Sequence, residues 1–89
     1  MKVKSLIRSF CEANSDKYSV CESYANDMLD KPCMGIVVKE GFSYMEMLME
    51  LTEYMDKADL EGDDLMFSDG MLIEEYGTDV IACFPNCQC

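Results

Sequence analysis

The chain has 89 residues, a net charge of −11 and a hydrophobic content of 49%. This length fits one domain, residues 1–89, with a thin core, and the hydrophobic content is too high for a disordered chain. No stretch approaches the roughly 18 apolar residues that cross a bilayer, and Met1 to Phe10 lacks the apolar run of a secretory signal. We therefore expect a single cytoplasmic domain with no membrane span.

The negative charge belongs to the second half of the chain. Residues 1–39 hold six basic and five acidic side chains, whereas residues 40–89 hold one basic side chain, Lys57, and thirteen acidic ones. A field of this kind repels nucleic acid and anionic membranes and attracts basic partners. Direct binding to DNA, RNA or a membrane is therefore not expected.

The beginning of the chain favours a helix. Apolar residues recur there at helical spacing and form one stripe: Val3, Leu6, Ile7, Phe10 and Cys11. Asn14, Ser15 and Asp16 interrupt that stripe, because their side chains compete for the backbone.

Residues 17–29 are ambiguous between helix and strand. A helix is favoured by one set of positions, Cys21, Tyr24, Ala25, Met28 and Leu29, and a strand by the alternation of Tyr18, Val20 and Tyr24. We favour the helix, since the later positions fit only that period. It must end near Asp30, because Pro32 disfavours helical geometry at the residue before it.

A strand and then a helix are predicted in the middle of the chain. Cys33 to Lys39 is a short run rich in β-branched residues, typical of a strand. After Gly41, Ser43 and Glu46 have the spacing of a capping box, which opens a helix from about Tyr44 to Ala58. The expected buried side of this helix carries Tyr44, Met47, Leu48, Leu51, Met55 and Ala58.

Beyond Gly62 the apolar period changes to two, which indicates a three-stranded antiparallel meander. The strands are expected around residues 65–67, 71–73 and 80–84, with turns at Asp69-Gly70 and at residues 77–79. Both faces of this meander are apolar, so helices cover one face, and a helix, a second subunit or a target must cover the other. The order of elements predicts an α+β domain: N-terminal helices, one strand, a central amphipathic acidic helix and the meander.

Catalysis is not expected, and neither is a cofactor. The chain has no histidine, the commonest general base, and no glycine-rich phosphate loop. Six cysteines are present, and four of them fall at apolar positions: Cys11, Cys21, Cys33 and Cys83. The residues that would form a metal site or a cross-linked tail are Cys83, Cys87 and Cys89, but paired zinc knuckles are missing, so we predict no metal site.

The acidic face of the central helix is the predicted binding site. Glu46, Glu50 and Glu53 lie at i, i+4 and i+7 and therefore share one stripe, although like charges at this spacing are mildly destabilising. The predicted contact residues are Glu46, Glu50, Glu53, Asp56, Asp59, Asp63 and Asp64.

We interpret the chain as a small acidic binding protein that is not an enzyme. Carboxylates at this spacing can occupy sites where a basic, nucleic-acid-binding protein expects phosphates. Small size and one-sided acidity are typical of nucleic-acid-mimic inhibitors of the antirestriction and anti-CRISPR type, which are encoded by viruses. Two alternatives stay open. One is a protein-interaction or homo-oligomerisation module with an apolar, methionine-rich surface, and the other is a protein whose cysteine-rich C-terminal tail binds metal or is modified.

Overall fold

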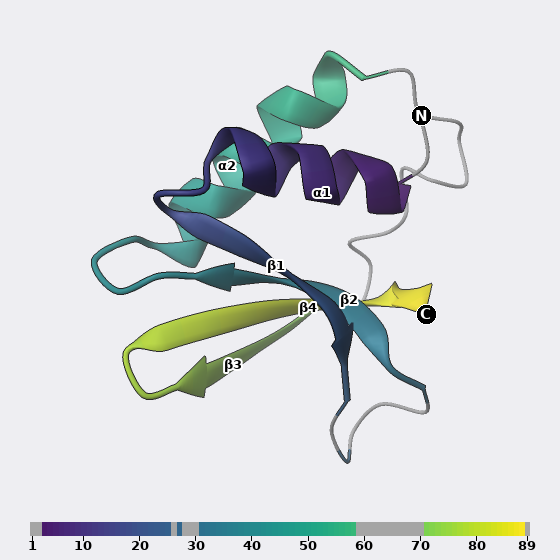
Figure 1. Ribbon diagram of the computed structural model, residues 1–89, viewed down its shortest axis with the longest axis vertical. Helices are drawn as coiled ribbons and strands as arrows, with labels where there is room; N and C mark the ends of the chain where they lie inside the picture. The colour runs from purple at the N-terminus through teal and green to yellow at the C-terminus, as the bar shows by residue number, and fades with distance from the viewer. Residues whose placement is uncertain (1–2, 26, 28–30, 59–70, 89) are drawn as a thin grey trace.

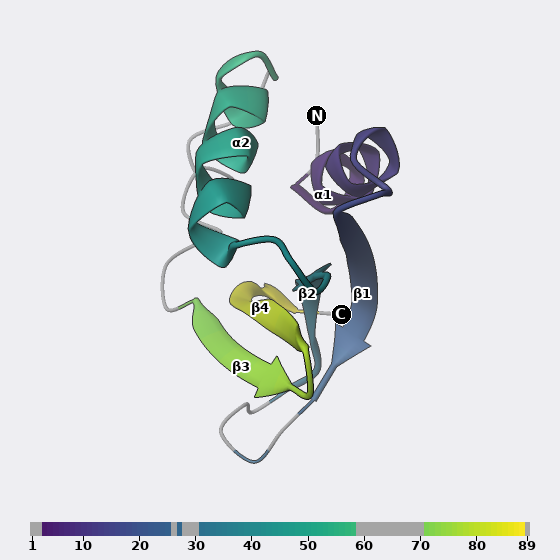
Figure 2. The ribbon, with the colours of Figure 1, turned by 90° about the vertical axis from the view of Figure 1, so that its left-hand side faces the viewer.

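A four-stranded antiparallel sheet with two helices on one face makes up the protein (Figures 1 and 2). The computed structural model describes residues 3–25, 27, 31–58 and 71–88, without the side chains of residues 76 and 88. In chain order the elements are α1 (Val3–Ala13), β1 (Tyr18–Tyr24), β2 (Cys33–Val38), α2 (Tyr44–Asp56), β3 (Leu72–Tyr76) and β4 (Asp79–Gln88). The predicted α+β class is confirmed.

Helix α1 follows the sequence prediction closely. Its buried residues are those of the predicted stripe: Val3, Leu6, Ile7, Phe10 and Cys11. The helix ends at Ala13; the Asn14 amide that follows makes a last helical bond to the carbonyl of Phe10 at 3.2 Å, and the Asn14 side-chain Nδ2 adds a second bond to the same carbonyl at 2.9 Å. The polar residue that was expected to interrupt the helix therefore caps its last turn.

The predicted second helix over residues 17–29 is wrong in its described part, where the chain forms strand β1. Tyr18 and Val20 point to the helices, as the alternating pattern suggested, and pair with Val38 and Ile36 of β2. A bulge between Cys21 and Tyr24 then turns Tyr24 to the opposite face. Pairing with β2 overrides the helical spacing of the later residues, of which 28 and 29 lie outside the described residues.

The C-terminal part does not form a separate meander. Strand β4 pairs with β3 on one side and with β2 on the other, so the order across the sheet is β1-β2-β4-β3. The turn predicted at residues 77–79 is present between β3 and β4, and Gly77 adopts a positive φ of 61° there. The strand expected at 65–67 and the turn at Asp69-Gly70 lie outside the described residues.

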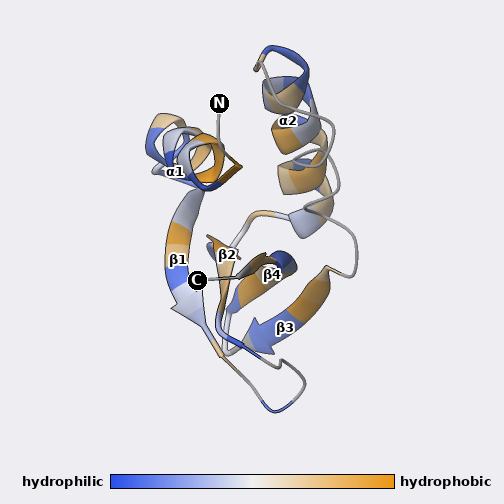
Figure 3. Ribbon diagram, turned by 90° about the vertical axis from the view of Figure 1, so that its right-hand side faces the viewer, coloured by the Kyte–Doolittle hydropathy of each residue, from blue (hydrophilic) through white to orange (hydrophobic). Residues whose placement is uncertain are grey.

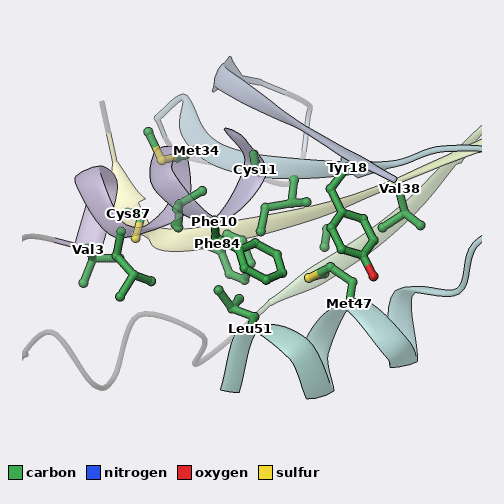
Figure 4. Packing of buried hydrophobic residues seen from close by; sticks show 14 residues of the cluster. Val3, Phe10, Cys11, Tyr18, Met34, Val38, Met47, Leu51, Phe84 and Cys87 are labelled. Carbon is green, nitrogen blue, oxygen red and sulfur yellow. The ribbon is translucent and has the colours of Figure 1, made fainter. Parts of the chain in front are cut away.

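The main core lies between the helices and the sheet (Figure 4). Phe10 stacks on Tyr18 with ring centroids 5.5 Å apart and meets the edge of Tyr54 at 5.6 Å. Strands β2 and β4 contribute fully buried side chains to this core: Met34, Ile36, Val38, Ala82 and Phe84. Burying a large apolar side chain stabilises a fold by roughly 1.5–3 kcal/mol, so this cluster is the main source of stability.

The opposite face of the sheet is also apolar, as predicted for the described strands. It carries a small second cluster, formed by Cys21, Tyr24, Cys33, Leu72, Ile81 and Cys83. The Tyr24 hydroxyl, from edge strand β1, donates a hydrogen bond to the carboxylate of Glu74 on the other edge strand, β3.

The close approach of β2 and β4 requires a glycine at position 35. A Cβ atom at Gly35 would lie 2.9 Å from the backbone carbonyl oxygen of Ala82. The missing side chain therefore lets the two central strands pair without a steric clash.

Among the described residues, neither helix has the length and apolar character needed to cross a membrane.

Candidate interaction site on helix α2

The start of α2 is fixed by Ser43. Its backbone is extended (φ −108°, ψ 139°), and its side-chain oxygen accepts a hydrogen bond from the Met45 amide at 3.1 Å. Ser43 is thus the N-cap, as predicted. A capping box would use the amide of Glu46, whereas the bond observed here comes from the amide of Met45, one residue earlier. The helix ends at Asp56 with Lys57 as its C-cap, two residues earlier than expected.

The inward side of α2 packs against α1 and the sheet. Met47 and Leu51 are fully buried there, while Leu48, Tyr54, Met55 and Ala58 are partly buried against the same core. Tyr44 was expected on this side, but it is 37% exposed, because it belongs to the first turn. Tyr54 contributes to the core instead and reaches Phe10.

The outward side of α2 combines methionines with carboxylates. Met45 and Met49 are 57% and 68% exposed, and they are one helical turn apart on the same stripe. Glu46, Glu53 and Asp56 are exposed around them. Figure 3 shows this mixture of apolar and polar residues along the helix. We call these five residues the outward face of α2.

Glu50 differs from its two acidic neighbours because it turns toward the body of the protein. Its side chain is 34% exposed, and its Oε1 accepts a charged hydrogen bond from Lys17 Nζ at 3.2 Å. Its Oε2 is buried and has no partner among the described residues. The predicted stripe is therefore partly wrong: Glu46 and Glu53 face solvent, whereas Glu50 is neutralised by a residue 33 positions earlier in the chain.

The Tyr18 side chain meets Glu50 beneath the helix. The Tyr18 hydroxyl is buried and, like Glu50 Oε2, forms no hydrogen bond of normal geometry within the described residues. Figure 4 shows the ring beside Phe10, with its oxygen on the side of α2. Burial, followed by a weak hydrogen-bond-type contact with the Glu50 carboxylate and by the negative charge of that group, raises the pKa of Tyr18 to about 12. The tyrosine therefore stays neutral at physiological pH.

The remaining predicted acidic residues fall into two groups. Asp56 lies at the C-terminal end of α2, where the helix dipole disfavours a negative charge; the last turn of the helix itself holds no basic residue, and Lys57 follows it as the C-cap. The other three residues lie outside the described part of the chain: Asp59, Asp63 and Asp64.

The structure separates the C-terminal cysteines. They were expected to share a tail, but residues 83 to 88 belong to strand β4. Cys83 lies in the cluster on the outer face of the sheet, Cys87 packs into the main core on the other face, and Cys89 lies outside the described residues. Within the described residues, no three His, Cys, Asp or Glu side chains are placed to hold a metal ion.

The buried thiols are poor nucleophiles. Burial raises the pKa of Cys11 to about 11. Burial, together with Cys33, Glu74 and Cys21 nearby, raises the pKa of Cys83 to about 12. Since the thiolate is the reactive form, these two side chains behave at neutral pH as small hydrophobic residues.

Comparisons with models of known protein families, with curated proteins and with solved structures found no match. The geometry of the outward face of α2 is therefore the basis for a functional proposal. The sequence pattern identified its carboxylates. It did not find the Lys17–Glu50 pair, for which the sequence carries no local signal.

Proposed function

We propose that this protein is a non-enzymatic binding protein whose outward face on α2 docks onto a basic protein. The partner's surface is one that otherwise binds nucleic acid, so the protein acts as an inhibitor that competes for it. The observation that carries this proposal is the composition of the outward face, where exposed Glu46, Glu53 and Asp56 lie beside Met45 and Met49, the two most exposed methionines among the described residues.

The charges on this face reduce the stability of the helix. Glu46, Glu53 and Asp56 have no ion-pair partner among the described residues. Glu53 is followed by Asp56 at a spacing of three, and a like-charge pair of this kind costs roughly 0.2–0.5 kcal/mol. Asp56 adds an unfavourable interaction with the negative end of the helix dipole. A basic partner would turn these unfavourable interactions into favourable ones.

The methionines supply the apolar part of the contact. Met45 and Met49 are flexible, polarisable side chains, which adapt to irregular partner surfaces. Interfaces commonly place such residues at their centre and charges at their rim. The proposed partner surface therefore has an apolar depression bordered by Lys or Arg side chains.

The same methionines also favour the second candidate function, an apolar interaction module in which the charge serves only solubility. The two candidates predict opposite responses to salt. Contacts between carboxylates and basic side chains are screened within about 8 Å at physiological ionic strength and weaken further as salt rises. Apolar contacts persist under the same conditions.

The test is affinity capture on the immobilised protein, with elution by increasing salt and with competition by duplex DNA or RNA. Three forms are compared: wild type, Glu46→Lys with Glu53→Lys, and Met45→Ser with Met49→Ser. Glu50 is left unchanged, because reversing its charge would break the pair with Lys17. We expect basic proteins that elute with salt, that are displaced by nucleic acid and that the Glu46/Glu53 variant does not retain.

A matched control carries the same change in net charge outside α2. Asp16→Lys with Glu75→Lys alters two exposed acidic residues and should retain the captured proteins. Retention of the same proteins by the Glu46/Glu53 variant contradicts the proposal. Capture that resists salt and is lost only in the Met45/Met49 variant supports the apolar module instead.

A further inference from the structure

Strand β1 forms one edge of the sheet, and a surface groove runs between it and α1. The groove has a volume of about 360 Å³, and its lining includes Arg8, Cys11, Glu12, Val20 and Lys39. Its charges balance: Arg8 is paired with Glu22 through two hydrogen bonds of 2.8 Å, from Nε and Nη2, and the acidic Glu12 and the basic Lys39 line the same groove. This neutral groove contrasts with the acidic second half of the chain.

The backbone N–H and C=O groups of Val20 point outward from the open edge of the sheet. The amide of Lys39 donates to the carbonyl of Lys17 at 3.0 Å, so residues 17 and 39 form a hydrogen-bonded pair of the β1–β2 ladder. In an antiparallel ladder, hydrogen-bonded pairs alternate with pairs that make no hydrogen bond to each other, so Tyr18 and Val20 belong to the second kind. Their N–H and C=O groups therefore point away from β2. The Tyr18 amide is bonded to the Asn14 carbonyl at 2.9 Å. Within the described part of the chain, the two backbone groups of Val20 have no partner.

We propose that the β1 edge binds the β1 edge of a second copy of this chain. In this homodimer the two strands run antiparallel about a twofold axis that passes between the Val20 residues. Each Val20 N–H donates to the Val20 C=O of the other copy, and the two sheets join into one. The two Val20 side chains, which are only partly buried in one copy, then face each other beside the α1–β1 grooves.

Charge complementarity favours a second copy as the occupant. Helix α1 runs back along β1 (Figure 1), so the twofold axis also sets the two α1 helices antiparallel. Lys4, near the start of one helix, then lies toward Glu12 and Asp16, near and just beyond the end of the other, while Arg8 stays paired with Glu22 of its own copy. Opposite charges therefore meet twice across the axis, which fits the self-complementary contact that a twofold interface requires.

The other edge of the sheet does not suit this pairing. Strand β3 carries Glu74 and Glu75, and acidic side chains on an edge strand disfavour pairing with an identical strand. From Tyr18 to Cys21 strand β1 has no charged residue and no proline. Most of the acidic α2 lies on the side of the molecule away from β1 (Figure 2), and Glu50, which reaches toward the start of β1, is paired with Lys17, so α2 does not oppose the contact.

The test measures the molar mass of the full chain over a concentration series in reductant, by sedimentation or by light scattering after gel filtration. We expect a reversible dimer, with exchange of the Val20 amide hydrogen slowing as the protein concentration rises. Val20→Pro removes the proposed donor, which the single copy does not use, and should raise the dimer dissociation constant at least tenfold. Circular dichroism checks that the variant stays folded.

Two further variants separate the backbone contact from loss of folding. Ser19→Lys places a charge on each side of the axis and should weaken the dimer, while Thr78→Lys, in the exposed β3–β4 turn, should not. Val20→Ala keeps the amide and should weaken the dimer less than Val20→Pro does. A wild type that stays monomeric at all concentrations overturns the proposal. A dimer that both Val20→Pro and Ser19→Lys leave unchanged overturns it as well, and this result places the contact elsewhere, for example on the outer face of the sheet.

Discussion

The buried hydroxyl of Tyr18 makes the stability of this fold depend on pH in the alkaline range. The side chain is fully buried, and its pKa rises from 10 in the unfolded chain to about 12 in the fold. The folded protein therefore holds the phenolic proton more tightly than the unfolded chain does. The resulting stabilisation is complete below about pH 10 and is lost as the pH rises toward 12.

The size of this effect follows from the pKa difference. One pKa unit corresponds to about 1.4 kcal/mol, so a rise from 10 to about 12 corresponds to a loss of roughly 2.7 kcal/mol of unfolding free energy. Tyr18→Phe removes the ionisable group and keeps the ring that stacks on Phe10. We expect the unfolding free energy of the variant to lie within about 1 kcal/mol of the wild type at neutral pH, since the hydroxyl has no hydrogen bond of normal geometry to lose.

The assay is urea unfolding of the wild type and Tyr18→Phe, followed by circular dichroism at a series of pH values from neutral to 12. Above about pH 10, and only there, the unfolding free energy of the variant should rise relative to that of the wild type, by up to roughly 2.7 kcal/mol. Tyr44→Phe, at a tyrosine that is 37% exposed, is the matched control. If the difference in unfolding free energy between Tyr18→Phe and the wild type stays constant from neutral pH to 12, the pKa of Tyr18 is not raised by folding. Marked destabilisation by Tyr18→Phe at neutral pH shows instead that the hydroxyl makes a strong bond in solution.

Two substitutions test how the elements around the site are built. Gly35→Ala should lower the unfolding free energy by about 1–3 kcal/mol in urea unfolding, because the new methyl group would lie 2.9 Å from the Ala82 carbonyl oxygen. An unchanged midpoint contradicts the close packing of β2 on β4. Ser43→Ala should cost about 1 kcal/mol by removing the N-cap of α2, whereas Ser43→Asp, which keeps an acceptor, should restore most of the loss. Equal loss in both variants excludes capping as the cause.

The sequence predicts those elements whose signal is local. Helix α1 carries a five-residue apolar stripe and a polar stop at Asn14, and helix α2 carries the Ser43 cap, so both were found. Strand β1 was missed because the spacing of Cys21 and Tyr24 is compatible with a helix. Only the ladder with Val38 and Ile36, and the bulge that follows it, determine the strand. Pairing partners of this kind are set by residues far apart in the sequence.

The candidate site was predictable in composition but not in detail. Spacing alone placed Glu46 and Glu53 on one stripe of the helix. It could not show that Glu50 turns inward, because Lys17 and Tyr18, which lie beside it, come from the turn before β1 and from β1 itself. The neutral groove beside β1 likewise depends on the strand that the sequence pattern did not predict.

The central claim is that the outward face of α2 binds a basic protein at its nucleic-acid-binding surface. The most direct measurement is the affinity of a captured basic protein for the wild type and for Glu46→Lys with Glu53→Lys, titrated over a range of salt concentrations with and without duplex DNA or RNA. We expect that wild-type binding weakens steeply with salt, is competed by nucleic acid and is lost in this variant, while Asp16→Lys with Glu75→Lys binds like the wild type. Binding that is insensitive to salt, or that is equal in the Glu46/Glu53 variant and the wild type, would contradict the central claim.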